Sequence, residues 1–175
     1  MSTNTSLFTS YWSSPLGELE ISATEEYIYS ILFVDSLKRP SPQKPATEHI
    51  PLIIRELESQ LSEYFKGKLR KFSIPFKHEG TTFQQLVWKE LEGIPFGKTV
   101  SYLELSRRIG NEKAIRAVGT TNGLNQMTII VPCHRVIGSN GSLVGYGGDL
   151  WRKKWLLAHE ARVSGTFQME LFSND

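Results

Sequence analysis

One short stretch of this sequence, VPCHRV at residues 131–136, holds residue types that can carry out nucleophilic chemistry. Cys133 is the only cysteine in the 175 residues, and His134 follows it directly. The thiolate is the reactive form of cysteine, and an imidazole can act as the base that removes the thiol proton. Glu160, 26 residues after His134, is a candidate to hold that imidazole and to favour its cationic form. These residue types predict an activated cysteine nucleophile.

The surroundings of this cysteine leave two interpretations open on the residues alone. Adjacent side chains diverge in a helix or a turn, so we expect a water molecule to bridge Cys133 and His134. Pro132 fixes its own φ and makes the approach to the cysteine rigid. The stretch therefore fits a reactive thiol, such as that of a cysteine hydrolase. It also fits a buried cysteine that only fills the core.

The composition narrows the class of protein. Apolar residues make up 39% and charged residues 22% of the chain, as in a soluble globular protein of one or two small domains. No apolar run approaches the ~20 residues that span a membrane, and the first residues lack the features of a secretion signal. A single cysteine excludes an internal disulfide, suits a reducing compartment and argues against a structural zinc site. We predict no metal site, because the four histidines show no ligand spacing.

The charges are unevenly placed although the net charge is only +2. Residues 1–78 hold 9 Lys or Arg and 9 Asp or Glu, whereas residues 98–162 hold 10 against 4, a net charge of +6. A basic segment in a nearly neutral protein can bind a polyanion. An ordinary solvated surface gives the same pattern, so charge alone does not decide between them.

The first 78 residues predict a small α/β domain with antiparallel strands and one covering helix. Three stretches rich in aromatic and β-branched residues, LFTSYWS, LGELEISAT and YIYSILFV, are separated by turn-forming residues. A proline-rich loop follows, and apolar residues then recur at helical spacing until Gly67.

Residues 79–175 predict a mostly helical second domain that contains a helix-turn-helix of winged-helix type. The first of its helices has Thr81 or Thr82 as its cap. The next opens with a Ser-x-x-Glu capping box and ends at Gly110, and a short helix rich in small residues follows after about four residues. Two such helices are typical of DNA-binding modules, but an αα-corner in a core has the same pattern. The fold class is therefore α+β.

Two features follow the cysteine. Asn140–Gly141 between short apolar runs predicts a hairpin turn, and GYGG at residues 145–148 lacks the spacing of a nucleotide-binding loop. The segment from Asp149 onward predicts a last helix, with Arg152, Lys153 and Lys154 on a solvated face.

In order along residues 81–162, the motifs RAVG, Asn125, VPCHRVIG, GYGG and WLLAHE closely resemble the methylated-DNA–protein-cysteine methyltransferases, also called 6-O-alkylguanine-DNA alkyltransferases. The Pro-Cys-His-Arg-Val centre is highly specific to that family. The chain departs from the family pattern at Gln126, where proline is frequent, and at Asp149, where a second glycine is frequent. These departures concern loop conformation.

The resemblance implies a role for each matching residue. Cys133 would accept the alkyl group, with His134 and Glu160 generating the thiolate, Asn125 bracing the turn and Tyr102 contacting the guanine and helping to turn the nucleotide out. Arg116 would enter the base stack in place of the extruded base. The resemblance further implies that Gln84, Asn111 and Ser139 contact DNA. It also implies a guanine pocket lined by Val136, Tyr146 and Gly147.

The resemblance also implies a function: a DNA repair methyltransferase that moves the alkyl group from 6-O-methylguanine, and from 4-O-methylthymine, to Cys133 in one irreversible turnover. The partner would be double-stranded DNA bound in its minor groove, with the damaged base flipped out. No cofactor and no membrane are implied. We predict a monomer in the cytoplasm near the nucleoid, or in the nucleus of a eukaryote, and leave cooperative binding along DNA open. A damage-binding module without activity and a cysteine hydrolase remain the alternatives.

Overall fold

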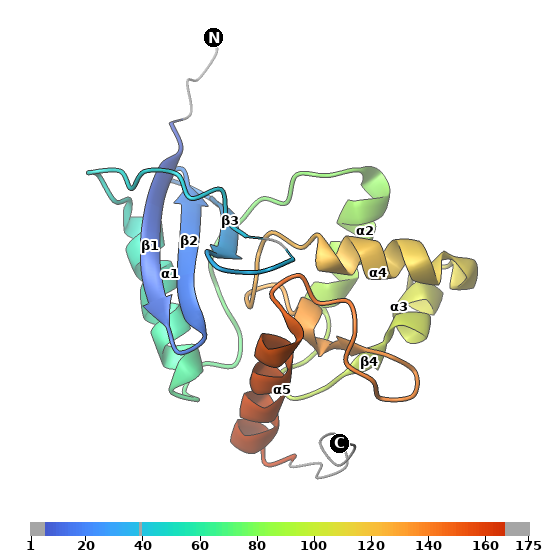
Figure 1. Ribbon diagram of the computed structural model, residues 1–175. Coiled ribbons are helices and arrows are strands. Elements are labelled where there is room, and N and C mark those ends of the chain that lie inside the picture. The colour runs from blue at the N-terminus through green and yellow to red at the C-terminus, as the bar shows by residue number, and fades with distance from the viewer. Residues whose placement is uncertain (1–5, 39, 167–175) are drawn as a thin grey trace. The chain divides into compact units, whose positions relative to one another are not determined.

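The computed structural model describes residues 6–38 and 40–166, and the contacts between residues divide the chain into two compact units. The first unit takes the residues up to Glu79 together with Gln126–Thr128. The second takes Gly80–Asn125 together with the residues from Ile129 onward. Each unit has its own sheet (Figure 1).

The first unit contains a three-stranded antiparallel sheet in the order β1-β2-β3. Its strands are β1 (Phe8–Ser14), β2 (Gly17–Ala23) and β3 (Ile28–Phe33). Ser14 pairs with Gly17 across a tight β1–β2 turn, and Gly17 has a φ of 116°, which favours glycine. The three predicted strands are confirmed, because their aromatic and β-branched residues suit a pleated, half-buried surface.

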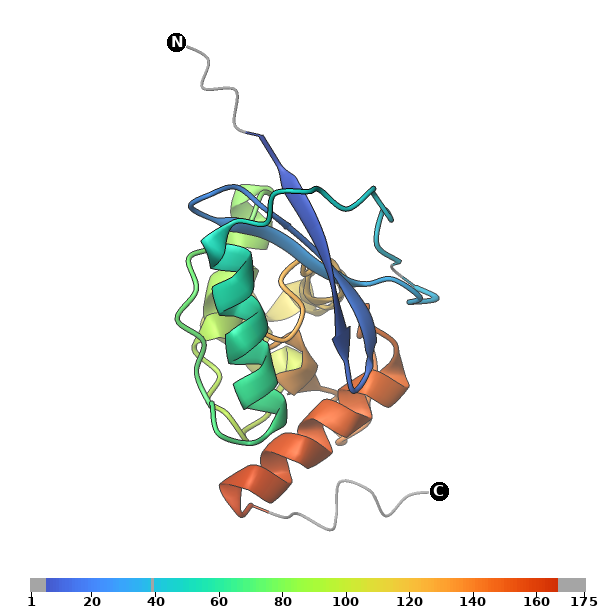
Figure 2. The same ribbon diagram turned by 90° about the vertical axis from the view of Figure 1, so that its left-hand side faces the viewer.

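Helix α1 (Leu52–Phe65) packs along β1 and β2 of the first unit (Figure 2). Its buried side chains recur at helical spacing, and they are Ile53, Ile54, Leu57, Leu61 and Tyr64. One apolar stripe therefore meets the sheet while the opposite side faces solvent, as the sequence pattern predicts.

Strand β3 also receives two short segments from elsewhere in the chain. Phe76 forms a parallel bridge with Ile28, and Met127 forms another with Ile31. The Ile31 amide donates to the Gln126 carbonyl at 2.8 Å. The first unit therefore completes one sheet edge with residues that lie far along the chain.

The second unit is mostly helical. It comprises α2 (Thr82–Glu92), β4 (Val100–Ser101), α3 (Tyr102–Arg108), the 3₁₀ helix η1 (Glu112–Ala114), α4 (Ile115–Gly123), the 3₁₀ helix η2 (Cys133–Arg135), β5 (Val136–Ile137) and α5 (Leu150–Ser164). Thr81 caps α2 in a capping box with Gln84, and the Ser101 hydroxyl accepts from the Glu104 amide at the start of α3. These caps fix where the helices begin.

The helix-turn-helix is formed by α3, a turn through Gly110, η1 and α4. Gly110 has a φ of 78°, the left-handed conformation that ends a helix sharply. Helix α4 packs against α2 and α3, and the Trp88 indole donates to the Thr121 carbonyl at 2.9 Å. The predicted α+β class, with strands first and a helical DNA-binding-type domain second, is confirmed.

Two expectations about the last part of the chain are corrected. Arg152 and Lys153 do not lie on a solvated face of α5, because both side chains are buried and only Lys154 of the three is exposed. The Asn140–Gly141 signal forms a turn, with the Gly138 amide donating to the Ser142 carbonyl, but no strand follows it as far as residue 166, where the described part of the chain ends. Among residues 6–38 and 40–166, no helix has the length and apolar character that crossing a membrane requires.

Candidate active site

Cys133 lies at the start of η2, between the apolar segment 129–132 and β5. Strand β5 runs parallel to β4, with Val100 beside Val136. The carboxamide of Asn125 donates to the Val131 carbonyl at 2.9 Å and to Cys133 Sγ at 3.0 Å. Asn125 therefore braces the turn and directs an N–H group at the sulfur, an interaction that favours the thiolate over the thiol. Cys133 is only 3% exposed.

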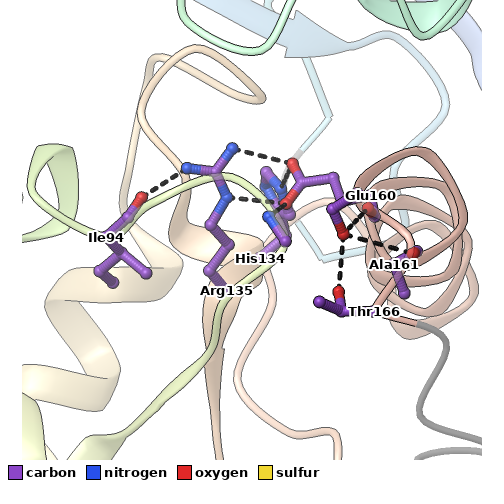
Figure 3. Close-up of polar contacts among 8 residues, drawn as sticks. Ile94, His134, Arg135, Glu160, Ala161 and Thr166 are labelled. Carbon is purple, nitrogen blue, oxygen red and sulfur yellow. Dashed lines mark hydrogen bonds and ion pairs between the residues drawn. The ribbon is translucent and has the colours of Figure 1, made fainter.

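His134 and Glu160 form a buried pair (Figure 3). His134 Nε2 lies 2.7 Å from Glu160 Oε1, and neither side chain is more than 1% exposed. With Nε2–H donating to the carboxylate, Nδ1 keeps its lone pair, and no hydrogen-bond partner in the described part of the chain reaches Nδ1. His134 is therefore oriented as a proton acceptor.

The Glu160 carboxylate is held by three further donors. Arg135 contacts both oxygens, with Nε to Oε2 at 2.8 Å and NH2 to Oε1 at 2.9 Å. The Gly97 amide donates to Oε2 at 3.1 Å, and Arg135 NH1 donates to the Ile94 carbonyl at 2.6 Å (Figure 3). This bidentate ion pair makes Arg135 a structural support of the turn.

The charges of this buried group follow from its contacts. Burial raises the pKa of Glu160, but the contact with His134 and the ion pair with Arg135 outweigh burial and hold it well below the ordinary value. Burial lowers the pKa of His134, and Arg135 and Lys153 lower it further against the opposing effect of Glu160. At rest the carboxylate is thus ionised and the imidazole neutral, the state that a general base requires.

Tyr102, at the start of α3, is buried near the turn that holds Cys133. Its hydroxyl donates to the Val144 carbonyl at 2.6 Å, and Lys153 Nζ donates to the same carbonyl at 2.7 Å. Burial raises the pKa of Tyr102, and a charge on Cys133 raises it further, against a small opposing effect of Asn122. The phenol therefore keeps its proton under ordinary conditions.

The three predicted pocket residues occupy β5 and the glycine-rich loop. Val136 and Tyr146 are buried and Gly147 is half-buried. Burial raises the pKa of Tyr146 well above its usual value, with Cys133 as the next cause. Asp149, where the family pattern has glycine, adopts a φ of 75° and binds Arg152 at 3.0 Å. This ion pair holds the residue in a backbone conformation that side chains rarely adopt.

The predicted DNA contacts lie at or near the surface. Arg116 is exposed on the first turn of α4, Asn111 is exposed just before η1, and Ser139 is exposed in the turn after β5. Gln84 is half-buried, and its carboxamide oxygen accepts from the Thr81 amide in the cap of α2. These four DNA contacts stay predictions.

Sequence reasoning missed two buried polar residues, Asn122 and Lys153, that contact the Tyr102 hydroxyl. Helical periodicity predicts both residues to be exposed, because Asn122 is a polar residue in a helix of small residues and Lys153 lies in a run of basic residues. Within the described ranges 6–38 and 40–166, no group of three His, Cys, Asp or Glu side chains could hold a metal ion.

Two family models cover most of the chain. Residues 7–78 match the ribonuclease-like domain of 6-O-methylguanine DNA methyltransferase, and residues 82–162 match its DNA-binding domain. A methylated-DNA–protein-cysteine methyltransferase of Mycolicibacterium paratuberculosis is 44% identical over 151 residues, covering 86% of this chain and 90% of the relative. The constitutive enzyme of Bacillus subtilis is 40% identical over 156 residues, covering 86% and 93%.

Solved structures agree with these sequence matches. The crystal structure of Mycobacterium tuberculosis O6-methylguanine methyltransferase is 38% identical, with a TM-score of 0.82 over 96% of this chain and all of that chain. A complex of the M. tuberculosis protein with DNA is 39% identical, with a TM-score of 0.76 over 89% and 93% of the two chains. With both halves matched in order and at this level of identity, the chain belongs to the 6-O-methylguanine DNA methyltransferase family.

Proposed function

We propose that this protein repairs DNA by moving the alkyl group of 6-O-alkylguanine, 6-O-methylguanine above all, and of 4-O-methylthymine onto Cys133. One observation carries the proposal. The Cys133 sulfur accepts a hydrogen bond from the Asn125 amide, and the neighbouring His134 is neutral and hydrogen-bonded to Glu160 through Nε2. Its Nδ1, on the other side of the ring, has no partner among the described residues and can accept a proton. This arrangement generates a thiolate without a cofactor. The protein itself is the acceptor, so each molecule acts once.

The transfer is a displacement at carbon. The Cys133 proton passes to His134 Nδ1 through a water molecule, the S–C bond forms, and the C–O bond breaks with its electron pair leaving on the guanine oxygen. Tyr102 gives its proton to the departing base, which leaves as neutral guanine, and the proton on His134 returns to Tyr102 through solvent. The raised pKa of Tyr102 suits this role, because the phenol releases its proton only as negative charge develops on the base.

The alkylated base must leave the duplex to reach the buried sulfur, which costs a few kcal/mol. The outer face of α4 carries small side chains near Arg116: Ala117 is exposed and Gly119 is half-exposed. Small side chains allow this helix to approach the minor groove closely, and the Arg116 guanidinium can fill the space that the flipped base leaves.

The same proposal locates the protein in the cytoplasm, or in the nucleus of a eukaryote, where its DNA is and where a single thiol stays reduced. It acts as a monomer on its lesion.

Intact-mass measurement after incubation with a 6-O-methylguanine duplex tests this function. We expect a gain of one methyl mass per protein molecule, located on Cys133, and none with the unmethylated duplex. Cys133→Ala should gain no mass while its gel shift with DNA persists, because the binding surface lies on the helix-turn-helix. A damage-binding module would show no mass gain in the unmodified protein. A cysteine hydrolase would release product repeatedly without retaining the methyl group.

A further inference from the structure

Asn122 is a fully buried residue in the last turn of α4 that no motif identified. Its carboxamide nitrogen lies 3.2 Å from the Cys133 carbonyl, 3.4 Å from the Gly145 carbonyl and 3.5 Å from the Tyr102 hydroxyl. These three oxygens come from η2, the glycine-rich loop and α3. One amide on α4 therefore contacts all three segments that line the site.

The Asn122 amide acts here only as a donor. Its two N–H groups are shared among three acceptors, while the amide oxygen has no hydrogen-bond partner within the described residues. A buried polar atom without a partner costs free energy, so a purely structural position would favour an apolar side chain of similar size. The donor function of Asn122 accounts for its presence.

The three acceptors matter for the proposed reaction. In the proposed reaction Tyr102 protonates the departing base, Cys133 carries the sulfur, and Gly145 begins the loop 145–148 that is proposed to line the guanine pocket. A shift of about 1 Å in such groups is enough to slow a reaction about a hundredfold.

We propose that Asn122 is a positioning residue that fixes the relative placement of Tyr102, the Cys133 turn and the glycine-rich loop. It does so from α4, the helix whose outer face carries Arg116, so the element that docks on DNA also sets the base pocket. This inference rests on the proposed function, because positioning has a measurable effect only if Cys133 accepts the alkyl group.

Two variants distinguish the effect of the Asn122 N–H donors from the effect of its side-chain volume. Asn122→Leu keeps the size of the side chain and removes the donor, and Asn122→Asp keeps its shape and turns an acceptor toward three oxygens. In single-turnover repair of a 6-O-methylguanine duplex, we expect each variant to lower the rate constant at saturating DNA by about tenfold, equivalent to about 1.4 kcal/mol. The Kd for the unmethylated duplex should stay unchanged.

Ser106→Ala is the matched control. The Ser106 hydroxyl is buried and donates to the Tyr102 carbonyl at 2.8 Å, so its loss removes one buried hydrogen bond of α3 without touching the three oxygens. We expect this variant to melt at a lower temperature and to repair DNA at the rate of the unmodified protein.

A double-mutant cycle with Tyr102→Phe tests whether Asn122 acts through the phenol. If it does, Asn122→Leu should slow repair about threefold or less in the Tyr102→Phe background. A full tenfold effect there, a change confined to the Kd for DNA, or an unchanged repair rate would each overturn the inference. Absence of methyl transfer in the unmodified protein would instead refute the proposed function.

Discussion

The Cys133 thiol and the His134 imidazole are both buried, and burial has opposite uses at the two residues. At His134 it keeps the ring neutral, as a base must be. At Cys133 it leaves little space around a sulfur that already accepts a hydrogen bond from Asn125. The burial of each residue predicts a change in protein stability that can be measured without an activity assay.

Methylation of Cys133 should destabilise the protein. The methyl group adds volume at a site that is 3% exposed, and it makes the sulfur a poorer acceptor for Asn125. Overpacking by one such group costs about 1–3 kcal/mol, and each kcal/mol lowers the melting temperature of a chain this size by roughly 2–4 °C. Thermal melts of free and fully methylated protein measure this, with protein exposed to unmethylated DNA as the control. An equal or higher midpoint after methylation would mean that the pocket has room for the product.

His134 should make the free energy of unfolding decrease on acidification. The unfolded chain binds a proton at His134 near pH 6.5, whereas the folded pKa is lower, so the unfolded state holds more protons below that pH. The loss from this residue is at most about 1.4 kcal/mol per pH unit between roughly pH 6.5 and the folded pKa.

Denaturant unfolding of the protein and of His134→Gln between about pH 8 and pH 5 isolates this contribution, since the two proteins differ only at this residue. The variant should show the shallower pH dependence. Coincident curves would mean that folding does not lower the pKa of His134.

At the scale of elements, the two faces of α4 differ in burial and in residue type. Its inner face carries the buried Val118, Thr121 and Asn122, while Arg116 and Ala117 face outward. No acidic side chain among the described residues pairs with Arg116, so its guanidinium is available to the duplex.

Arg116→Ala should slow repair in duplex DNA more than repair of the free alkylated base. The free base needs no flipping, so it gains nothing from a side chain that fills the stack. A stacking contribution of about 1–3 kcal/mol corresponds to roughly 5- to 150-fold in the duplex rate. Parallel single-turnover assays on the two substrates decide this, and equal slowing on both would show that Arg116 supports the fold or the chemistry instead.

The sequence predicted those elements whose signals are local. Strands β1 to β3 follow from β-branched and aromatic runs, and α2 and α3 begin where Thr81 and Ser101 provide caps. The Cys133–His134–Glu160 group was predicted from residue types and resemblance; the structure pairs His134 with Glu160, and the role of the group stays a prediction.

What the sequence could not supply depends on partners distant in the chain. Lys153 is buried because its ammonium reaches the Val144 carbonyl and the Tyr102 hydroxyl, 51 residues away. Helical periodicity records which residues share a face but not what that face meets. For the same reason the contacts of Asn122 were invisible before the fold was known.

At the scale of the molecule, only some of the basic residues of the second unit lie at its surface. Of the ten Lys and Arg between residues 98 and 162, three are buried, namely Arg135, Arg152 and Lys153. Two of the remaining seven, Arg107 and Arg108, form exposed ion pairs with glutamates. The surface available to DNA phosphates is therefore modest.

The salt dependence of DNA binding should be correspondingly moderate. If three or four of these cations reach phosphates, the slope of log K against log salt concentration should be about −3 to −4, at roughly 0.9 per contact. Fluorescence anisotropy with an unmethylated duplex measures it. A slope near −8 would implicate a second basic surface. The candidate is residues 66–78, which hold five Lys or Arg and no acid, and Lys68→Gln with Lys71→Gln would then reduce the slope.

The pairing of Gln126–Thr128 with β3 has a consequence for synthesis of the chain. The Ile31 backbone hydrogen-bonds to both Gln126 and Thr128. This edge of the sheet therefore stays unpaired until Gln126, 47 residues after Glu79, has been synthesised. At roughly 5–20 residues per second, the ribosome needs about 2–9 s for that stretch. During this interval the nascent first unit presents an unpaired strand edge, which is the type of surface that pairs with other chains. The yield of correctly folded protein should therefore depend on translation speed between residues 80 and 128.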